Sequence, residues 1–167
     1  MKIKGNKDKE LYSSTLKELK STKEKQERLK IIQKIIKIKD PWASEVLLDA
    51  LDEHCEATRE LIINELGNRE NLDLSKTFQK LSFSPWFVKS AFIKILGLQK
   101  NPKSIIYIEI LINEPNADVR RTAAQTLGKI KGEEALSLLL KLSKDKNYFV
   151  RMSAEKSLKK SVNLKFS

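Results

Sequence analysis

The sequence of 167 residues is poor in cysteine, histidine, glycine and proline, and each shortage excludes a class of structure. Cys55 is the single cysteine, so no disulfide can form within the chain, which favours a reducing compartment. His54 is the single histidine, and one histidine cannot complete a usual zinc site. Five glycines and four prolines provide too few turn residues for an all-β fold.

Long apolar runs are also missing. No segment approaches the roughly 20 apolar residues of a membrane span. The basic start, MKIKGNKDKELYSS, is not followed by the apolar run of a signal peptide, so we expect a cytoplasmic protein. Leu, Ile, Lys and Glu are abundant. Of all residues, 40% are hydrophobic and 33% are charged. That composition predicts a folded, helical, soluble protein.

The net charge of +11 is distributed unevenly along the chain. Residues 1–40 carry +7, residues 41–70 carry −6, and residues 71–167 carry +10. We expect the acidic band to lie between two basic zones; its members are Glu45, Asp49, Asp52, Glu53, Glu56 and Glu60. A protein that only coats nucleic acid would not be expected to carry such an acidic band.

Apolar residues recur with a period of about 30 residues through most of the chain. One column consists of Ile36, Leu66, Leu96, Leu127 and Leu158, and a second, four positions earlier, of Ile32, Ile62, Phe92, Ala123 and Ala154. Side chains at this spacing share one face of a helix, so each pair predicts a first helix, called helix A. Gly67, Gly97 and Gly128 follow the leucine column and are expected to end helix A in a left-handed conformation.

A second helix, called helix B, is predicted after each of the first four A helices. Its columns are Leu48, Phe78, Ile108 and Leu139, then Leu51, Leu81, Leu111 and Leu142. Prolines that start helices well stand between the predicted helices. The segment SIIYIEILI, residues 104–112, would suit a strand by propensity, but the columns pass through it in register and predict a helix. A period in this range indicates a solenoid, here an all-α superhelix of about five two-helix repeats with the last one truncated.

The fourth repeat carries the most specific pattern, D-V-R-x-x-A-A-x-x-L-G followed by E-A-L-x-x-L-L. The first part of this pattern begins at Asp118 and the second part at Glu134. The fifth repeat keeps Val150, Arg151, Ala154 and Leu158. At these residues the sequence resembles the HEAT-repeat superfamily, in particular the short bacterial repeats of the phycobilisome-lyase type. The resemblance covers about residues 23–160. Residues 1–22 are expected to form a basic tail and capping helix, and residues 23–167 the repeat domain.

The resemblance implies a role for a row of cations at equivalent positions, which are Arg59, Lys89, Arg120 and Arg151. In this family such residues usually form a structural ladder, with Asp118 and its equivalents pairing between neighbouring repeats. The alternative is that the row binds a ligand. Stacked repeats bury the contacts between them, which favours the ladder.

Catalytic patterns are weak. His54 and Cys55 could form a nucleophile or hold a metal, but they are adjacent residues in a predicted turn, and no metal or cofactor is expected. Deoxyhypusine hydroxylase shares the repeats but needs several His-Glu pairs, which this sequence lacks. HEAT-like DNA glycosylases use Trp on a cationic face. Here Trp42 and Trp86 both follow proline, so we interpret them as side chains that pack at the start of a helix.

We therefore predict a non-catalytic, monomeric adaptor or scaffold that binds another protein along the concave face lined by B helices. One alternative is nucleic-acid binding through the basic ends, expected to be weak and salt-sensitive. Another is a lyase-type or enzyme-maturation subunit that needs a partner chain. The predicted partner site consists of Lys76, Lys80, Ile106, Ile110, Lys141 and Lys144. Apolar residues flanked by lysines suit an acidic amphipathic helix, unless the fold itself covers Ile106 and Ile110.

Overall fold

The computed structural model describes residues 5–70 and 72–163, and within these ranges all regular structure is helical. The chain forms two compact units, residues 1–83 and 84–167, each of which is described by itself. The side chains of Lys76, Lys80, Val162 and Asn163 lie outside this description. The predicted division into segments 1–22 and 23–167 stays a prediction.

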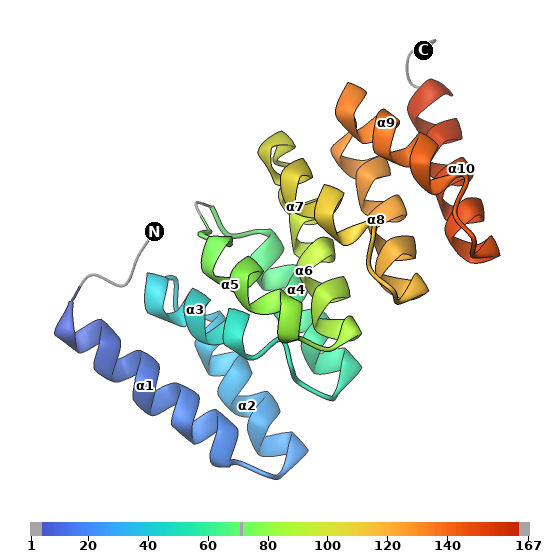
Figure 1. Ribbon diagram of the computed structural model, residues 1–167. Helices are drawn as coiled ribbons and strands as arrows, with labels where there is room; N and C mark the ends of the chain where they lie inside the picture. Colours follow the sequence, from blue (N-terminus) through green and yellow to red (C-terminus); the bar gives the residue numbers. More distant parts are fainter. Residues whose placement is uncertain (1–4, 71, 164–167) are drawn as a thin grey trace. The chain divides into compact units, whose positions relative to one another are not determined.

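The first unit contains five α-helices and one short 3-10 helix among its described residues (Figure 1). They are α1 (Asn6–Ser21), α2 (Lys25–Ile36), α3 (Pro41–Asp49), α4 (Glu56–Gly67), α5 (Ser75–Lys80) and η1 (Leu81–Phe83). Helix α3 packs against α1, α2 and α4. Helices α2 and α4 are therefore the A helices of two repeats, α3 and α5 are their B helices, and α1 precedes the first repeat.

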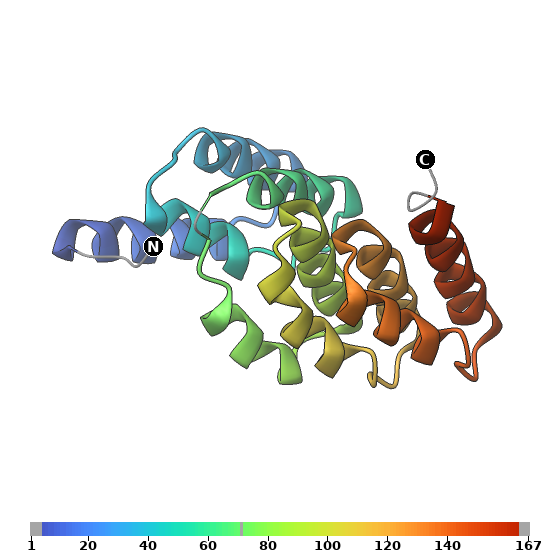
Figure 2. The same ribbon diagram turned by 90° about the horizontal axis from the view of Figure 1, so that it is seen from above.

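The second unit contains the remaining repeats. Its elements are α6 (Trp86–Gln99), η2 (Pro102–Ser104), α7 (Ile105–Leu111), α8 (Ala117–Ile130), α9 (Glu133–Leu142) and α10 (Tyr148–Asn163). The A helices α6, α8 and α10 pack side by side in one layer, and the B helices α7 and α9 form the other (Figure 2). This two-layer arrangement confirms the predicted all-α, HEAT-like helical repeat.

The predicted columns form the core. Ile32, Ile62, Leu66, Phe92, Leu96, Leu127, Leu139 and Ala154 are all fully buried. Three column residues, Ile36, Phe78 and Leu158, are only half-buried. The strand-like segment is helical as α7, because Ile105, Ile108 and Leu111 share the buried face of that helix. Burial of an amphipathic face thus outweighs the intrinsic preference of isoleucine for strands.

Gly67 is the last residue of α4, as predicted, although its backbone is not left-handed, whereas the predicted role is wrong for the other two glycines. Gly97 and Gly128 lie inside α6 and α8, and the left-handed backbone positions fall at Lys100, Lys131 and Gly132 instead. A Cβ atom on Gly97 would lie 2.9 Å from Cγ2 of Thr126, and one on Gly128 would lie 2.8 Å from Cβ of Ser157. These distances are shorter than real Cβ contacts allow. The two glycines therefore permit close approach of the next A helix rather than a turn.

Candidate functional site

The exposed face of α7 is apolar. Ile106 and Ile110 are 60% and 58% exposed, whereas Ile105 and Ile112 are buried. The two exposed side chains are one helical turn apart and lie on one face of the helix. The fold of the described residues therefore leaves them accessible to a partner, although singly exposed apolar residues are common in proteins.

Helix α9 extends this apolar face and adds charge to it. Leu140 is exposed on α9, a helix that packs against α7. Lys141 on the same helix and Lys144 just after it are also exposed. We call Ile106, Ile110 and Leu140, together with Lys141 and Lys144, the B-helix surface. The apolar columns do not identify Leu140, which directly follows the core residue Leu139.

Lys76 and Lys80, the other two predicted partner residues, belong to α5 in the first unit. Their side chains lie outside the described part of the structure. Their contribution to partner binding stays a prediction from repeat register.

Arg120 is held by internal contacts. Its Nε donates to Oδ2 of Asp145 at 2.7 Å, its second terminal nitrogen donates to Oδ1 at 2.9 Å, and Nη1 donates to the carbonyls of Glu114 and Pro115. Both partners of the ion pair are nearly buried. The hydrogen bonds between Arg120 and Asp145 raise the pKa of the Arg120 guanidinium and hold the pKa of the Asp145 carboxyl below its ordinary value.

Asp118 does not supply the carboxylate that we expected. It pairs with Arg121 of its own helix at 2.8 Å, and both side chains are about half exposed. The carboxylate that binds the arginine row comes instead from a residue that follows the next B helix. Asp145 holds this position for Arg120 and Glu114 holds it for Lys89, in each case 25 residues after the cation.

Three further arginines make contacts of this kind. Arg28, which was not among the predicted cations, pairs with Glu53 at 2.7 Å, again 25 residues later. Arg151 donates to the carbonyls of Asp145 and Lys146, and Arg59 donates to the carbonyl of Glu53. These contacts support a structural role for the row, which the substitutions proposed below test.

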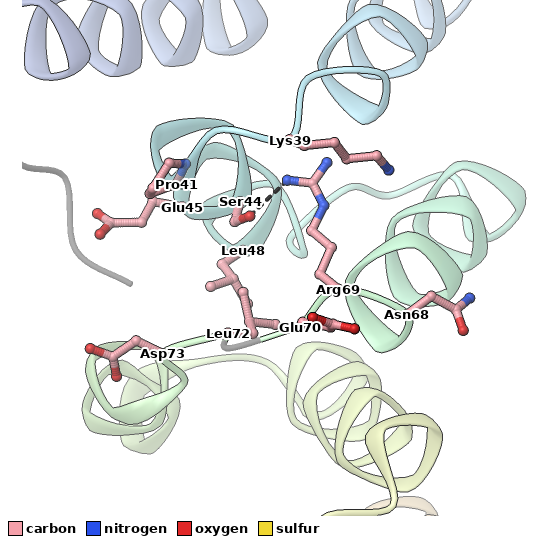
Figure 3. A pocket seen from close by; sticks show the side chains of 10 residues that line it. All are labelled: Lys39, Pro41, Ser44, Glu45, Leu48, Asn68, Arg69, Glu70, Leu72 and Asp73. Atoms are coloured by element: carbon pink, nitrogen blue, oxygen red, sulfur yellow. Dashed lines mark hydrogen bonds between the residues drawn. The ribbon is translucent and has the colours of Figure 1, made fainter.

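A cleft of about 480 Å³ lies in the first unit, between the start of α3 and the long connection from α4 to α5 (Figure 3). Its lining residues are Lys39, Pro41, Ser44, Glu45, Leu48, Asn68, Arg69, Glu70, Leu72 and Asp73. Arg69 extends across the cleft and donates to Oγ of Ser44 at 2.7 Å, to Oε1 of Glu65 at 2.8 Å and to the carbonyl of Ile38 at 2.8 Å.

The two cations that line this cleft, Lys39 and Arg69, both bind Glu65 of α4. Burial by itself would raise the pKa of Glu65, but hydrogen bonds from Lys39 and Arg69 together lower it. Arg69 thereby joins α4 to α3 and to the carbonyl end of α2. Its contacts are those of a structural residue, and the cleft offers a mixed-charge surface with no dominant sign.

Part of the acidic band likewise holds the first unit together. Glu53 is buried against Arg28, and Asp49 accepts a hydrogen bond from the phenol of Tyr12 on α1. Burial of Tyr12 raises its pKa, and the bond to Asp49 raises it further. Two of the six carboxylates of the acidic band therefore form contacts within the unit.

His54 and Cys55 lie in the connection between α3 and α4. His54 is exposed, and Cys55 precedes α4, where Thr58 hydrogen bonds hold the pKa of the thiol below its ordinary value. Among the described residues, no three His, Cys, Asp or Glu side chains gather as a metal site would require. Trp42 is buried in α3, as expected of a packing residue, whereas Trp86 at the start of α6 is half exposed.

Comparison with known proteins identifies one family. The family described as HEAT repeats matches residues 74–159, slightly more than half of the chain. The match covers most of the second unit and the end of the first. The comparison with curated proteins gives no match. In the part of the chain that the structure describes, no helix combines the length and hydropathy of a membrane span.

Proposed function

Since the chain belongs to the HEAT-repeat family, we propose that it is a non-catalytic adaptor or scaffold that binds another protein on the B-helix surface. HEAT repeats generally mediate contacts between proteins, and the family is typically non-catalytic. The observation that carries the proposal is the exposure of Ile106 and Ile110 on a helix whose other isoleucines are buried. We place the protein in the cytoplasm as a monomer. Its assignment to the phycobilisome-lyase type stays a prediction from the sequence.

The other repeats show that the fold does not require apolar residues at these positions. The residues equivalent to Ile106 and Ile110 are Lys76 and Lys80 in the second repeat, and Ser137 and Lys141 in the fourth. In the fourth repeat α9 is fully formed and its core face is buried. Packing of a B helix therefore does not by itself require isoleucine at these positions.

The charge around these isoleucines indicates the chemistry of the partner. Lys141 and Lys144 lie at the carboxyl-terminal end of α9, and Leu140 lies beside Lys141. An amphipathic helix with apolar residues on one face and carboxylates at one end would complement this surface. Electrostatic attraction of this kind chiefly raises the association rate and weakens with salt.

The test uses substitutions that the fold already accepts elsewhere. In the double variant Ile106→Ser with Ile110→Lys, α7 carries at these two positions the residues that α9 has at the equivalent positions. Full-length protein and double variant are each used to capture partners from a lysate of the native host, with and without nuclease, followed by mass spectrometry. A control variant, Leu61→Ser, removes an exposed apolar side chain from α4 in the first unit.

We expect a protein partner that binds in the presence of nuclease, is retained by the control and is lost with the double variant. Capture that disappears with nuclease would favour the nucleic-acid alternative. Loss of helical circular dichroism in the double variant would show that the isoleucines belong to the core.

A further inference from the structure

A second exposed apolar group lies at the first turn of α10. Tyr148, Phe149 and Met152 are 61%, 56% and 46% exposed, and we call them the α10 patch. The two rings meet edge to face with their centroids 5.5 Å apart. The guanidinium carbon of Arg151 lies 5.9 Å from the centroid of the Tyr148 ring, a distance at which a cation is attracted to the ring. Tyr, Phe, Met and Arg are the residues enriched at protein interfaces.

The patch borders a groove of about 330 Å³ between the first turns of α8 and α10. Its lining residues are Ala117, Asp118, Arg121, Asn147 and Phe149. The side chain of Asn147 caps α10 by accepting from the backbone N–H groups of Phe149 and Val150. This cap fixes the first turn of α10 and therefore the backbone from which the patch projects.

The fourth repeat shows that folding does not require this patch. The residues of α8 equivalent to Tyr148, Phe149 and Met152, one repeat earlier, are Ala117, Asp118 and Arg121. Both helices nevertheless bury the same core residues completely, Val119 and Ala123 in α8 and Val150 and Ala154 in α10. An A helix therefore packs equally well with a small residue and an ion pair in place of the three apolar side chains.

We propose that the α10 patch and its groove bind a linear, acidic segment of a partner protein that inserts an aromatic or long aliphatic side chain. The site is separate from the B-helix surface and does not depend on it. The second unit carries sixteen Lys and Arg against seven Asp and Glu, a net charge of +9. Lys146 and Lys156 are exposed on either side of the patch in sequence, and Lys156 is one helical turn from Met152.

The local chemistry favours a peptide over single-stranded nucleic acid. Bases bind by stacking on open aromatic faces, and Met152 provides no such face. Asp118 in the groove and Glu155 on α10 would repel phosphates, whereas a peptide can place its carboxylates away from them. A methionine beside two rings forms an adaptable apolar surface for a protein side chain.

The experiment selects ligands without knowledge of the natural partner. A phage-displayed library of random peptides of about 12 residues is selected against the full-length chain at about 0.15 M salt. Enriched peptides are synthesised and titrated by fluorescence polarisation against the chain and its variants. The decisive variant is Tyr148→Ala with Phe149→Asp and Met152→Arg, which gives α10 the residues of α8. The new Asp and Arg cancel in charge and stand at the spacing of the pair Asp118–Arg121.

We expect enriched peptides to combine an aromatic or aliphatic residue with two or more carboxylates. Their affinity should fall at least about tenfold for the triple variant, as expected when interface anchors are removed. Their affinity for the Ile106→Ser with Ile110→Lys variant should be unchanged. If the triple variant loses helical circular dichroism, Tyr148→Ala replaces it, since this change leaves the groove-lining Phe149 in place.

Several results would overturn the proposal. These are a selection without enriched peptides, enriched peptides that lack carboxylates, and peptides that bind the triple variant as tightly as the original chain. Peptides that lose affinity only for the B-helix variant would support the proposed function but not this second site. A labelled oligouridine of about 20 nucleotides that binds at the same salt and is lost with the triple variant would assign the patch to nucleic acid instead.

Discussion

The two units build the same kind of repeat with different local contacts. In the second unit, Asn116 caps α8 and Asn147 caps α10 through equivalent side-chain bonds in successive repeats. Among the described helices of the first unit, α1 to α5, none has a side-chain hydrogen bond at its N-cap. The second unit also has the glycine contacts between its A helices.

The first unit has the pair Arg28–Glu53 at the same 25-residue spacing and adds individual long-range bonds. Arg69 joins α4 to α3 and α2, and Tyr12 joins α1 to α3. The family match lies mainly in the second unit, where contacts repeat at a fixed spacing. The comparison indicates that the recognisable repeat pattern reflects recurring caps and helix contacts, whereas a degenerate repeat can be held by contacts that have no equivalent in its neighbours.

The largest expected effect on stability comes from the core leucines of the A helices, which occur in both units. Leu66→Ala in the first unit and Leu127→Ala in the second should each cost about 2 to 5 kcal/mol of unfolding free energy, because both side chains are fully buried. Chemical denaturation measures the loss, and hydrogen exchange with mass spectrometry locates it. We expect faster exchange mainly in the unit that carries the substitution. The assigned register would be wrong if thermal stability did not change in either variant.

The arginine row should show a smaller difference between the units. Asp145→Asn should cost about 3 kcal/mol, because it leaves the nearly buried Arg120 without its carboxylate. Glu53→Gln should cost less, because Arg28 is more exposed than Arg120. Equal losses in a denaturation experiment would contradict this ranking.

The same pair predicts a dependence on pH. Because the pKa of Asp145 is lower in the folded state, its contribution is complete above the unfolded pKa of about 3.9 and is lost as pH falls through the folded pKa. The stability difference between the original chain and Asp145→Asn should therefore shrink below about pH 4. A difference that stayed constant down to about pH 2 would contradict the assigned partner.

The helix contacts of the second unit should respond to a single added methyl group. Gly128→Ala should cost about 1 to 3 kcal/mol despite the better helix propensity of alanine, since the new Cβ would overlap Ser157. Ser157→Gly removes the side-chain atoms that the methyl group meets, so the double variant should recover most of the loss. A stabilising Gly128→Ala in thermal unfolding would show that the helices can separate without cost.

The smallest effect is expected where the second unit is strained. Lys131 has φ 64° and ψ −177°, a conformation that glycine adopts with little cost. Lys131→Gly should therefore stabilise the protein by about 1 kcal/mol, whereas Lys129→Gly inside α8 should destabilise it by a similar amount. Thermal unfolding of the two variants gives shifts of opposite sign if the assignment is right.

The sequence was sufficient to predict the helices and their buried faces, because the period of the apolar columns records burial directly. It was not sufficient to predict what the next repeat places against a given residue. The glycine rule suggested turns at Gly97 and Gly128, since helix-end glycines are common and close helix contacts leave no local pattern. The exposure of Tyr148 and Phe149 was also missed, because the columns identify the core positions of α10 and not the groove beside them.

One missed contact did leave a signal in the sequence. The cation and the carboxylate of the arginine row are separated by 25 residues in Arg28–Glu53, Lys89–Glu114 and Arg120–Asp145. A search for opposite charges at a constant offset would have selected Asp145 over Asp118. The D-V-R pattern of the family suggested Asp118 instead, because Asp118 stands two positions before Arg120 in the same helix.

The fixed spacing of these contacts has a consequence for how such a chain can grow. A tandem duplication of residues 116–146 would insert one whole repeat with a complete cap, Arg120 with its own Asp145, and a further Gly128. At the new junction Gly128 would face Thr126, a combination already present between Gly97 and Thr126. The cap, the ion pair and the glycine contact would thus each have a precedent in the existing chain. A gene that duplicates this segment in frame would encode a longer protein whose added repeat already carries these three contacts.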